Sequence, residues 1–203
     1  MRVMISSVTV YCSSSSAIPK AYFDAGEALG RAIAENAWKL VYGGNSVGLM
    51  GHVANACRAA GGKVVGITPQ LFVDKKVHDE KCHDLVVCQT MRERKQIMEE
   101  RADAFVALPG GLGTFEELFE IIVGKQLRYH TKPIALLNVE GYFDPLLAMI
   151  EHGIEHRFIK PAARELYFVT EDVEAIVEHL RMYQPPAGSD KWFSHTGPKS
   201  AAE

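Results

Sequence analysis

Short apolar segments alternate along the chain with longer segments whose apolar positions recur at helical spacing. The short segments cover residues 5–12, 39–42, 63–68, 84–88, 104–108, 132–138 and 167–169. The helical patterns cover residues 20–36, 47–60, 91–101, 114–127, 145–152 and 171–182. Segments 104–108 and 132–138 are almost continuously apolar, which is typical of strands buried on both faces. The pattern therefore predicts an α/β fold, in which a parallel sheet with right-handed crossovers carries helices on both faces.

The chain has 203 residues, which suits a single domain, and we expect that domain to span residues 1–183. Residues 184–203 are rich in proline and glycine, and their apolar positions follow neither the spacing of a helix nor that of a strand. This composition predicts an irregular C-terminal tail, with Trp192 and Phe193 packed against the domain.

Composition excludes several classes of protein. The formal net charge of −3 gives no general attraction to nucleic acid or to an anionic membrane. No apolar stretch is long enough to span a bilayer, and the first apolar segment resembles a strand more than a secretory signal. The four cysteines form no Cys-x-x-Cys pair and no secreted-type framework, so we expect a cytoplasmic protein.

The unusual residues come directly after predicted strands. Four serines begin at Ser13, two glycines follow at Gly43 and Gly44, a basic segment spans 91–95, and a glycine-rich turn spans 109–117. In a parallel sheet all strands end at one edge, and ligands bind beyond it. In the common strand order 3-2-1-4-5 the first, fourth and fifth strands are neighbours, so we expect their ends to converge.

The glycine-rich turn, Pro-Gly-Gly-Leu-Gly-Thr-Phe-Glu-Glu, is the strongest signal. Its glycines let the backbone turn sharply and approach a ligand. A helix starting near Thr114 would add its dipole and free N–H groups, which favour an anion such as phosphate, and Thr114 can cap that helix or bind the anion. By itself the turn could be a plain strand-to-helix connection, but Arg94 and Lys95 at the same edge favour a ligand site. The turn is not the dinucleotide-binding fingerprint. That fingerprint follows the first strand of a fold, whereas this turn follows the fifth apolar segment.

Arg92 and Arg94 would fall in the first turn of a helix, where a cation opposes the dipole. Such a conflict often marks a functional residue, and a solvated charged face accounts for Arg92 better than for Arg94. Glu116 and Glu117 would fall in the first turn of the next helix, where acids are stabilised, so they have a structural explanation as well as a functional one.

Three segments together resemble the Lonely Guy phosphoribohydrolases. Residues 109–117 resemble that family's Pro-Gly-Gly-x-Gly-Thr-x-x-Glu motif, and residues 91–95 resemble its Met-x-x-Arg-Lys segment. Residues 42–51, Tyr-Gly-Gly-Asn-Ser-Val-Gly-Leu-Met-Gly, resemble its Gly-Gly-Gly-x-x-Gly-Leu-Met-Gly loop. The resemblance extends in matching order from about residue 8 to residue 180.

This resemblance implies a Rossmann-like, doubly wound fold and hydrolysis of nucleoside 5′-monophosphates to free base and ribose 5-phosphate. The implied substrates are N6-modified adenine nucleotides, such as cytokinin riboside monophosphates, and AMP, with no cofactor. It also implies a homodimer, for which Leu49 and Met50 are candidate interface residues. Family members have often been labelled lysine decarboxylases, but no lysine is placed to form a cofactor Schiff base beside a pyridinium partner.

By the same resemblance, Arg94 and Glu117 are the catalytic residues. The implied substrate-binding residues are Ser13, Gly43, Gly44, Met91, Lys95, Gly110, Gly111, Gly113, Thr114 and Glu116. Cleavage of an N-glycosidic bond builds positive charge on the ribose, so Glu117 is expected to activate water or to stabilise that charge. Arg94 could bind phosphate or ribose, or orient Glu117. No step in this chemistry requires a metal.

Two departures from the family pattern concern the base more than the reaction. Ser13 and Asn45 each stand where the family usually has glycine.

Two other functions remain open. Residues 152–156, His-Gly-Ile-Glu-His, match a short zinc-protease motif that also arises by chance. A non-catalytic carrier of a nucleotide or a nucleotide-bearing cofactor could share the same fold.

Overall fold

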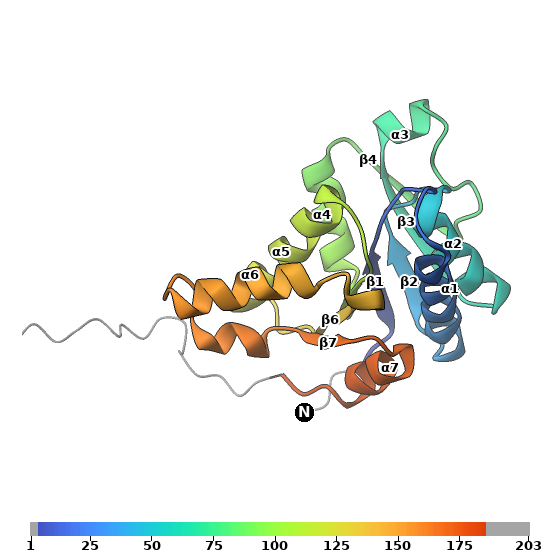
Figure 1. The fold of residues 1–203 in the computed structure, drawn as a ribbon. Coiled ribbons are helices and arrows are strands. Elements are labelled where there is room, and N and C mark those ends of the chain that lie inside the picture. Colours follow the sequence, from blue (N-terminus) through green and yellow to red (C-terminus); the bar gives the residue numbers. More distant parts are fainter. Residues whose placement is uncertain (1–3, 186–203) are drawn as a thin grey trace, which may run out of the picture.

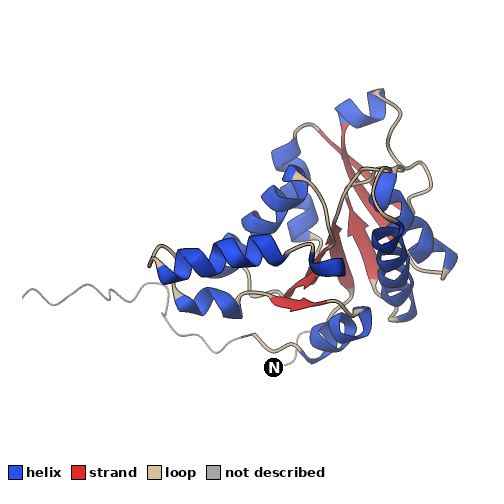
Figure 2. Cartoon of the chain, in the orientation of Figure 1, coloured by secondary structure: helices blue, strands red, loops and turns tan. Residues whose placement is uncertain are grey.

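A computed structural model describes residues 4–185 as a seven-stranded sheet covered by helices on both faces (Figure 1, Figure 2). The strands are β1 (Ser7–Tyr11), β2 (Lys39–Tyr42), β3 (Val64–Pro69), β4 (Asp84–Cys88), β5 (Ala104–Ala107), β6 (Ile134–Leu137) and β7 (Phe168–Thr170). The α-helices are α1 (Lys20–Glu35), α2 (Gly48–Ala59), α3 (Gln70–Asp74), α4 (Met91–Glu100), α5 (Leu112–Gln126), α6 (Asp144–Glu155) and α7 (Val173–Met182). All strand pairs are parallel, which confirms the predicted doubly wound α/β fold.

The expected adjacency is confirmed for the first and fifth strands, which pair directly, and is wrong for the fourth strand. The strand order is β4-β3-β2-β1-β5-β6-β7, so β4 lies at an outer edge and β1 in the centre. The chain builds outward from β1 to β4, then crosses back to place β5 on the other side of β1. This reversal between β1 and β5 is the switch point of the sheet, where a crevice forms because the connections leave in opposite directions.

The sheet separates two apolar cores. Helices α1, α2 and α7 cover one face, and α4, α5 and α6 cover the other (Figure 1). Alternation along β1 supplies both layers, since Val8 and Val10 belong to the first core and Tyr11 to the second. The central strands are apolar at consecutive positions because both of their faces are buried.

Several predicted element boundaries need correction. The short helix α3 and the two 3₁₀ turns, η1 (Val139–Gly141) and η2 (Pro161–Glu165), were not predicted. Helix α5 begins at Leu112 instead of Thr114, because Gly111 provides the extended N-cap conformation. Leu49 is completely buried inside the protein, so it cannot contribute to a dimer interface.

The predicted packing of Trp192 and Phe193 lies outside the described residues, and the domain limits stay a prediction. Among residues 4–185, no helix combines the length and the apolar character that a membrane span needs.

Helices α1 and α2 approach closely because α1 presents glycines to α2. A Cβ atom on Gly30 would lie 2.4 Å from the Val53 carbonyl oxygen, and one on Gly26 would lie 2.6 Å from Leu49 Cδ1. Both distances are shorter than a non-bonded contact allows. The pair therefore acts as a small-residue seam that holds α2, and the glycine-rich loop before it, against the body of the protein.

We predict that Gly30→Ala destabilises the protein by about 1–3 kcal/mol, because overpacking outweighs the gain in helix propensity of about 1 kcal/mol. Urea unfolding measures this change. Ala28→Gly on the exposed face of α1 is the matched control and should cost about 1 kcal/mol through propensity alone. A Gly30→Ala variant that is more stable than the wild type would show that the close approach is not required.

Candidate active site

The loops that follow β1, β2 and β5 enclose one open cavity at the switch point. Its volume is about 470 Å³. The lining residues are Cys12, Ser13, Ser14, Ser15, Gly43, Asn45, Met50, Phe72, Met91, Arg94, Gly111, Leu112, Gly113, Thr114, Glu116 and Glu117. The edge of the sheet that carries the unusual sequence segments therefore also carries a cavity large enough for a small molecule.

Most of the predicted site residues line this cavity, and three do not. Gly44, Lys95 and Gly110 are not among the lining residues. Gly44 forms the left-handed turn of the second loop, with a φ of 68°. Gly110 leaves room for the Thr114 hydroxyl, since a Cβ atom there would lie 2.1 Å from Thr114 Oγ1. Gly110 and Lys95 therefore act on lining residues, since Gly110 makes room for Thr114 and Lys95 forms an ion pair with Glu116.

The start of α5 presents backbone donors to the cavity. Gly111 is its N-cap, and within the described chain no side chain accepts a hydrogen bond from the first N–H groups of the helix. Gly111 and Gly113 are exposed, while Thr114 is buried. A 15-residue helix with free N–H groups at its N-terminus attracts an anion through those donors and through its dipole. Thr114 was one candidate for the cap of this helix. It is instead the third residue of α5, so it does not cap the helix.

Arg94 and Glu117 form a buried ion pair at the cavity wall. Arg94 Nη1 donates to Glu117 Oε1 at 2.9 Å, and the two residues are only 4% and 5% exposed. The Arg94 Nε atom donates to the Ile67 carbonyl oxygen at 3.1 Å. Two nitrogens of the guanidinium group are thus engaged by the protein, so its plane is fixed against the carboxylate.

Arg94 reaches the site by a route that the sequence pattern did not indicate. Helix α4 starts beyond the edge strand β4 and returns across β3 toward β5. The guanidinium group then lies over Gly43, where a Cβ atom would be 1.7 Å from Arg94 Nη2. Glycine at position 43 is therefore required by Arg94 itself.

Burial changes the acidity of Glu117. Loss of solvent raises the pKa of its carboxyl group, and the charge and hydrogen bond of Arg94 oppose this effect without cancelling it. Glu117 is the sixth residue of α5, in its second turn, so the predicted first-turn position is wrong. A carboxylate with a raised pKa is a better proton acceptor than an ordinary surface glutamate.

Lys95 is held by two carboxylates on α5. Its Nζ atom lies 2.8 Å from Glu116 Oε1 and 3.0 Å from Glu120 Oε2. Burial alone would lower the pKa of Lys95, but the hydrogen bonds to both glutamates raise it above its ordinary value. The two ion pairs hold Lys95 against α5 and fix Glu116, which lines the cavity.

A buried cluster that the sequence did not reveal holds the second glycine-rich loop. The Asp79 N–H donates to the Gly44 carbonyl oxygen at 2.8 Å. The Asp79 carboxylate accepts hydrogen bonds from Tyr42 Oη and Arg58 Nη1, both at 2.7 Å. Burial alone would raise the pKa of Asp79, but its hydrogen-bond donors lower it below the ordinary value.

Two further cavity residues, Met50 and Phe72, were also missed as ligand contacts. Phe72 belongs to the short helix α3 that follows β3. The rule that ligands bind beyond strand ends would have drawn attention to this segment, had the helix after the third strand been predicted.

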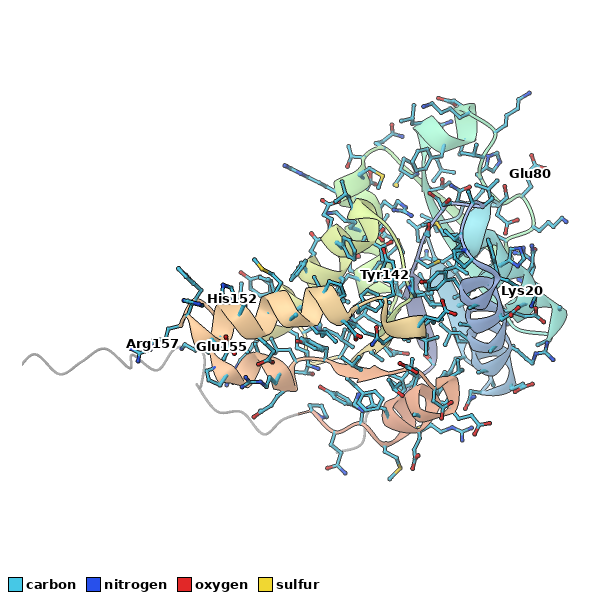
Figure 3. All side chains as sticks on the ribbon, viewed as in Figure 1. Lys20, Glu80, Tyr142, His152, Glu155 and Arg157 are labelled. Carbon is cyan, nitrogen blue, oxygen red and sulfur yellow. The ribbon has the colours of Figure 1, made fainter. Side chains whose placement is uncertain are left out.

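The zinc motif does not form a metal site. His152 and Glu155 lie at the end of α6 opposite to the end near Tyr142 (Figure 3). The rings of His152 and His156 are 4.3 Å apart. Among residues 4–185, no group of three or more histidine, cysteine, aspartate or glutamate side chains is arranged to hold a metal ion.

Solved structures share this fold. The molybdenum cofactor carrier protein of Chlamydomonas reinhardtii matches with a TM-score of 0.66 and 22% identity, over 87% of this chain and 98% of that chain. The molybdenum cofactor binding protein of Rippkaea orientalis matches with a TM-score of 0.65 and 23% identity, over 86% of this chain and 94% of that chain. At this level of identity the likeness concerns the fold alone.

Closer relatives are known from their sequences. The family model described as "Possible lysine decarboxylase" matches residues 50–180. The "Probable cytokinin riboside 5'-monophosphate phosphoribohydrolase LOGL9" of Oryza sativa subsp. japonica is 44% identical over 178 residues, or 88% of this chain and 78% of the relative. The "Cytokinin riboside 5'-monophosphate phosphoribohydrolase" of Rhodococcoides fascians is 44% identical over 177 residues, or 86% of this chain and 89% of the relative. The chain therefore belongs to the family of these phosphoribohydrolases, which that family model covers.

Proposed function

We propose that this protein hydrolyses nucleoside 5′-monophosphates to a free base and ribose 5-phosphate, and that N6-modified adenine nucleotides and AMP are its substrates. The observation that carries the proposal is the buried Arg94–Glu117 pair beside the uncapped N-terminus of α5. An anion site and a proton acceptor in one cavity are what this reaction needs. The activity for which the relatives are named supports the same reaction.

The 5′-phosphate binds at the start of α5. The N–H groups near Gly111 and Gly113 supply donors, and the Thr114 hydroxyl supplies another. Glu117 lies five residues beyond Leu112, which corresponds to a rise of about 7.5 Å along the helix. This spacing is comparable with the length of ribose 5-phosphate, so a nucleotide anchored by its phosphate brings its C1′ atom toward the carboxylate.

Glu117 acts on the reacting atoms. As the bond between C1′ and the base nitrogen breaks, its electron pair leaves with the base and positive charge develops on the ribose. The Glu117 carboxylate stabilises this charge and accepts a proton from the water whose oxygen bonds to C1′. The departing base takes up a proton from solvent. Burial favours this role because it raises the pKa of the carboxyl group.

Arg94 orients Glu117 and moderates its basicity. Its Nε and Nη1 atoms already donate to Ile67 and Glu117. Glu116 lines the cavity and binds ribose hydroxyl groups, and Lys95 holds it in place. Ser13 and Asn45, which also line the cavity, contact the nucleotide and influence the choice of base.

We also propose a homodimer. Its interface differs from the expected one, because Leu49 is buried. Helix α5 instead exposes Leu112, Phe119 and Val123, and α4 exposes Met91 next to the cavity. Leu112, Phe119 and Val123 recur at spacings of seven and four residues, so they share one face of α5, and an exposed apolar patch of this kind often marks a protein–protein interaction site. Sedimentation velocity at micromolar concentration should give the mass of a dimer, and a monomer would argue against this surface.

All four cysteines are free thiols, which agrees with a reducing cytoplasm as the proposed location.

The alternative function is a non-catalytic carrier. A carrier would bind a nucleotide without releasing its base, so incubation with a panel of nucleoside monophosphates, followed by chromatography for free base, distinguishes the two functions.

We predict that the 5′-phosphate is required. Two hydrogen bonds to a charged phosphate, at about 1.5 kcal/mol each, correspond to a kcat/KM for adenosine at least about 100-fold below that for AMP. Steady-state release of adenine from both compounds measures this ratio. Equal turnover of AMP and adenosine would contradict the placement of the phosphate at α5.

We predict that Glu117→Gln lowers single-turnover base release by about 100-fold or more, because glutamine keeps the shape but cannot accept the proton. Calorimetric binding of AMP serves as the control, since retained affinity shows that the cavity is intact. The melting temperature should fall, because Arg94 then remains buried without a counter-charge.

The pH profile provides a second readout for the same variant. Wild-type base release should decrease as the pH falls through the raised pKa of Glu117, because the protonated carboxyl group cannot accept a proton. The residual rate of Glu117→Gln should lack this decrease. Near-normal release by the variant at every pH would exclude Glu117 from the mechanism and point to Glu116, the other carboxylate that lines the cavity.

A further inference from the structure

Two backbone carbonyl groups directly before α5 are occupied by hydrogen bonds from other loops. The Pro109 carbonyl oxygen accepts from the Ser13 N–H at 3.1 Å. The Gly110 carbonyl oxygen accepts from the Tyr142 hydroxyl at 2.5 Å. The first contact comes from the neighbouring strand end, whereas the second comes from the turn after β6. Tyr142 does not line the cavity, and the reaction proposed above gives it no part.

The Tyr142 contact sets the direction of a backbone donor. In a planar trans peptide unit, the C=O and N–H bonds point in opposite directions. When the Gly110 carbonyl points to Tyr142, the Gly111 N–H must point away from it. Gly111 lines the cavity, so the hydroxyl of Tyr142 keeps the carbonyl out of the anion site and the N–H turned toward it.

This peptide unit needs an external hold because both of its residues are glycine. Glycine permits a wider range of φ and ψ than other residues, so a Gly–Gly peptide can rotate into alternative orientations. Apart from the neighbouring residues in the chain, no described atom lies within 4 Å of the position that a Gly111 Cβ would take, so packing does not restrain Gly111 from that side. A rotated unit would present its carbonyl oxygen to a bound phosphate and repel it.

Tyr142 itself is held firmly. Its ring stacks on Phe115 with centroids 6.4 Å apart and meets the edge of the Tyr22 ring at 5.9 Å. The preceding turn is unusual, since Glu140 and Gly141 have φ values of 51° and 69°. Glu140 is the unusual one of the two, because a left-handed conformation costs free energy for a residue other than glycine and persists only where surrounding contacts hold it.

The contacts that hold this turn come from Asn138. Its amide donates to Asp144 Oδ1 at 2.8 Å and its side-chain oxygen accepts the Phe143 N–H at 2.7 Å. The turn thereby places Tyr142 at the end of α6 nearest the sheet (Figure 3). The direction of the hydroxyl is thus set by the turn and by the aromatic rings around it.

We infer that Tyr142 is a positioning residue, whose hydroxyl orients the Gly110–Gly111 peptide so that the start of α5 binds a phosphate monoester. The identity of that monoester as the 5′-phosphate of a nucleotide rests on the proposed function. The hydrogen bond between Tyr142 and Gly110, and the orientation of the peptide unit that follows from it, are independent of the proposed function.

The test is calorimetric titration of Tyr142→Phe with ribose 5-phosphate and, separately, with adenine. The phenyl ring keeps the stacking and removes only the hydroxyl. Loss of one hydrogen bond predicts a Kd for ribose 5-phosphate about 3- to 10-fold weaker. The Kd for adenine should be unchanged, because adenine has no phosphate. With AMP as the substrate, KM should rise by a similar factor while kcat changes less than about twofold.

Tyr22→Phe is the matched control. Tyr22 belongs to the same aromatic cluster, and its hydroxyl has no hydrogen-bond partner among the described residues, so ribose 5-phosphate affinity should not change. Unchanged ribose 5-phosphate binding by Tyr142→Phe would overturn the inference. Equal weakening of adenine binding would also overturn it, because it would indicate general damage to the cavity. An absence of ribose 5-phosphate binding in the wild type would overturn it as well. Because the titration needs no hydrolysis, a wild type that binds ribose 5-phosphate but releases no base would refute only the proposed function.

Discussion

The buried ion pair between Arg94 and Glu117 is the interaction on which the geometry of the site depends. Removing two charged groups from water costs several kcal/mol for each ion, and this cost is offset only where the pair is close and well hydrogen-bonded. Here the carbonyl of Ile67 and the carboxylate of Glu117 engage the guanidinium group, and Gly43 leaves room for it. Burial that is unfavourable for stability raises the pKa of Glu117, which suits a proton acceptor.

The topology of the sheet brings this pair to the anion site. The reversal between β1 and β5 opens the crevice, and α4 returns across β3 to deliver Arg94 there. Helix α5 carries both remaining parts, since its N-terminus faces the cavity and Glu117 lies in its second turn. One rigid helix thereby sets the separation between the phosphate donors and the carboxylate. The turn after β6 adds the Tyr142 contact that orients the first of these donors.

Much of the fold could be predicted from the sequence because alternating short apolar runs and helical patterns are local signals. The strand order could not, because an apolar run at 84–88 has the same appearance at an edge as in the centre. The glycine-rich segments were informative for a physical reason: Gly43 must be small beneath Arg94, and Gly110 must be small beside Thr114.

Some features have no local signature. The hydrogen bond from Asp79 to Gly44 joins residues that are 35 positions apart in the sequence. The hydrogen bond from Tyr142 to Gly110 joins residues that are 32 positions apart. A tyrosine or an aspartate in such a loop looks like any surface polar residue until the fold brings its partner close. The burial of Leu49 is likewise set by the glycine seam on α1, which lies far from it in the sequence.

Whether Arg94 acts through Glu117 is decided by a double-mutant cycle on single-turnover base release from AMP. The cycle compares Arg94→Ala, Glu117→Gln and the double variant, each corrected for AMP occupancy by calorimetry. If the two residues work as one unit, the double variant should be no slower than Glu117→Gln alone, to within a few-fold, because the positioning of a group that is already removed no longer matters. A loss equal to the product of the two single losses would contradict the account, since it would show that Arg94 and Glu117 contribute independently.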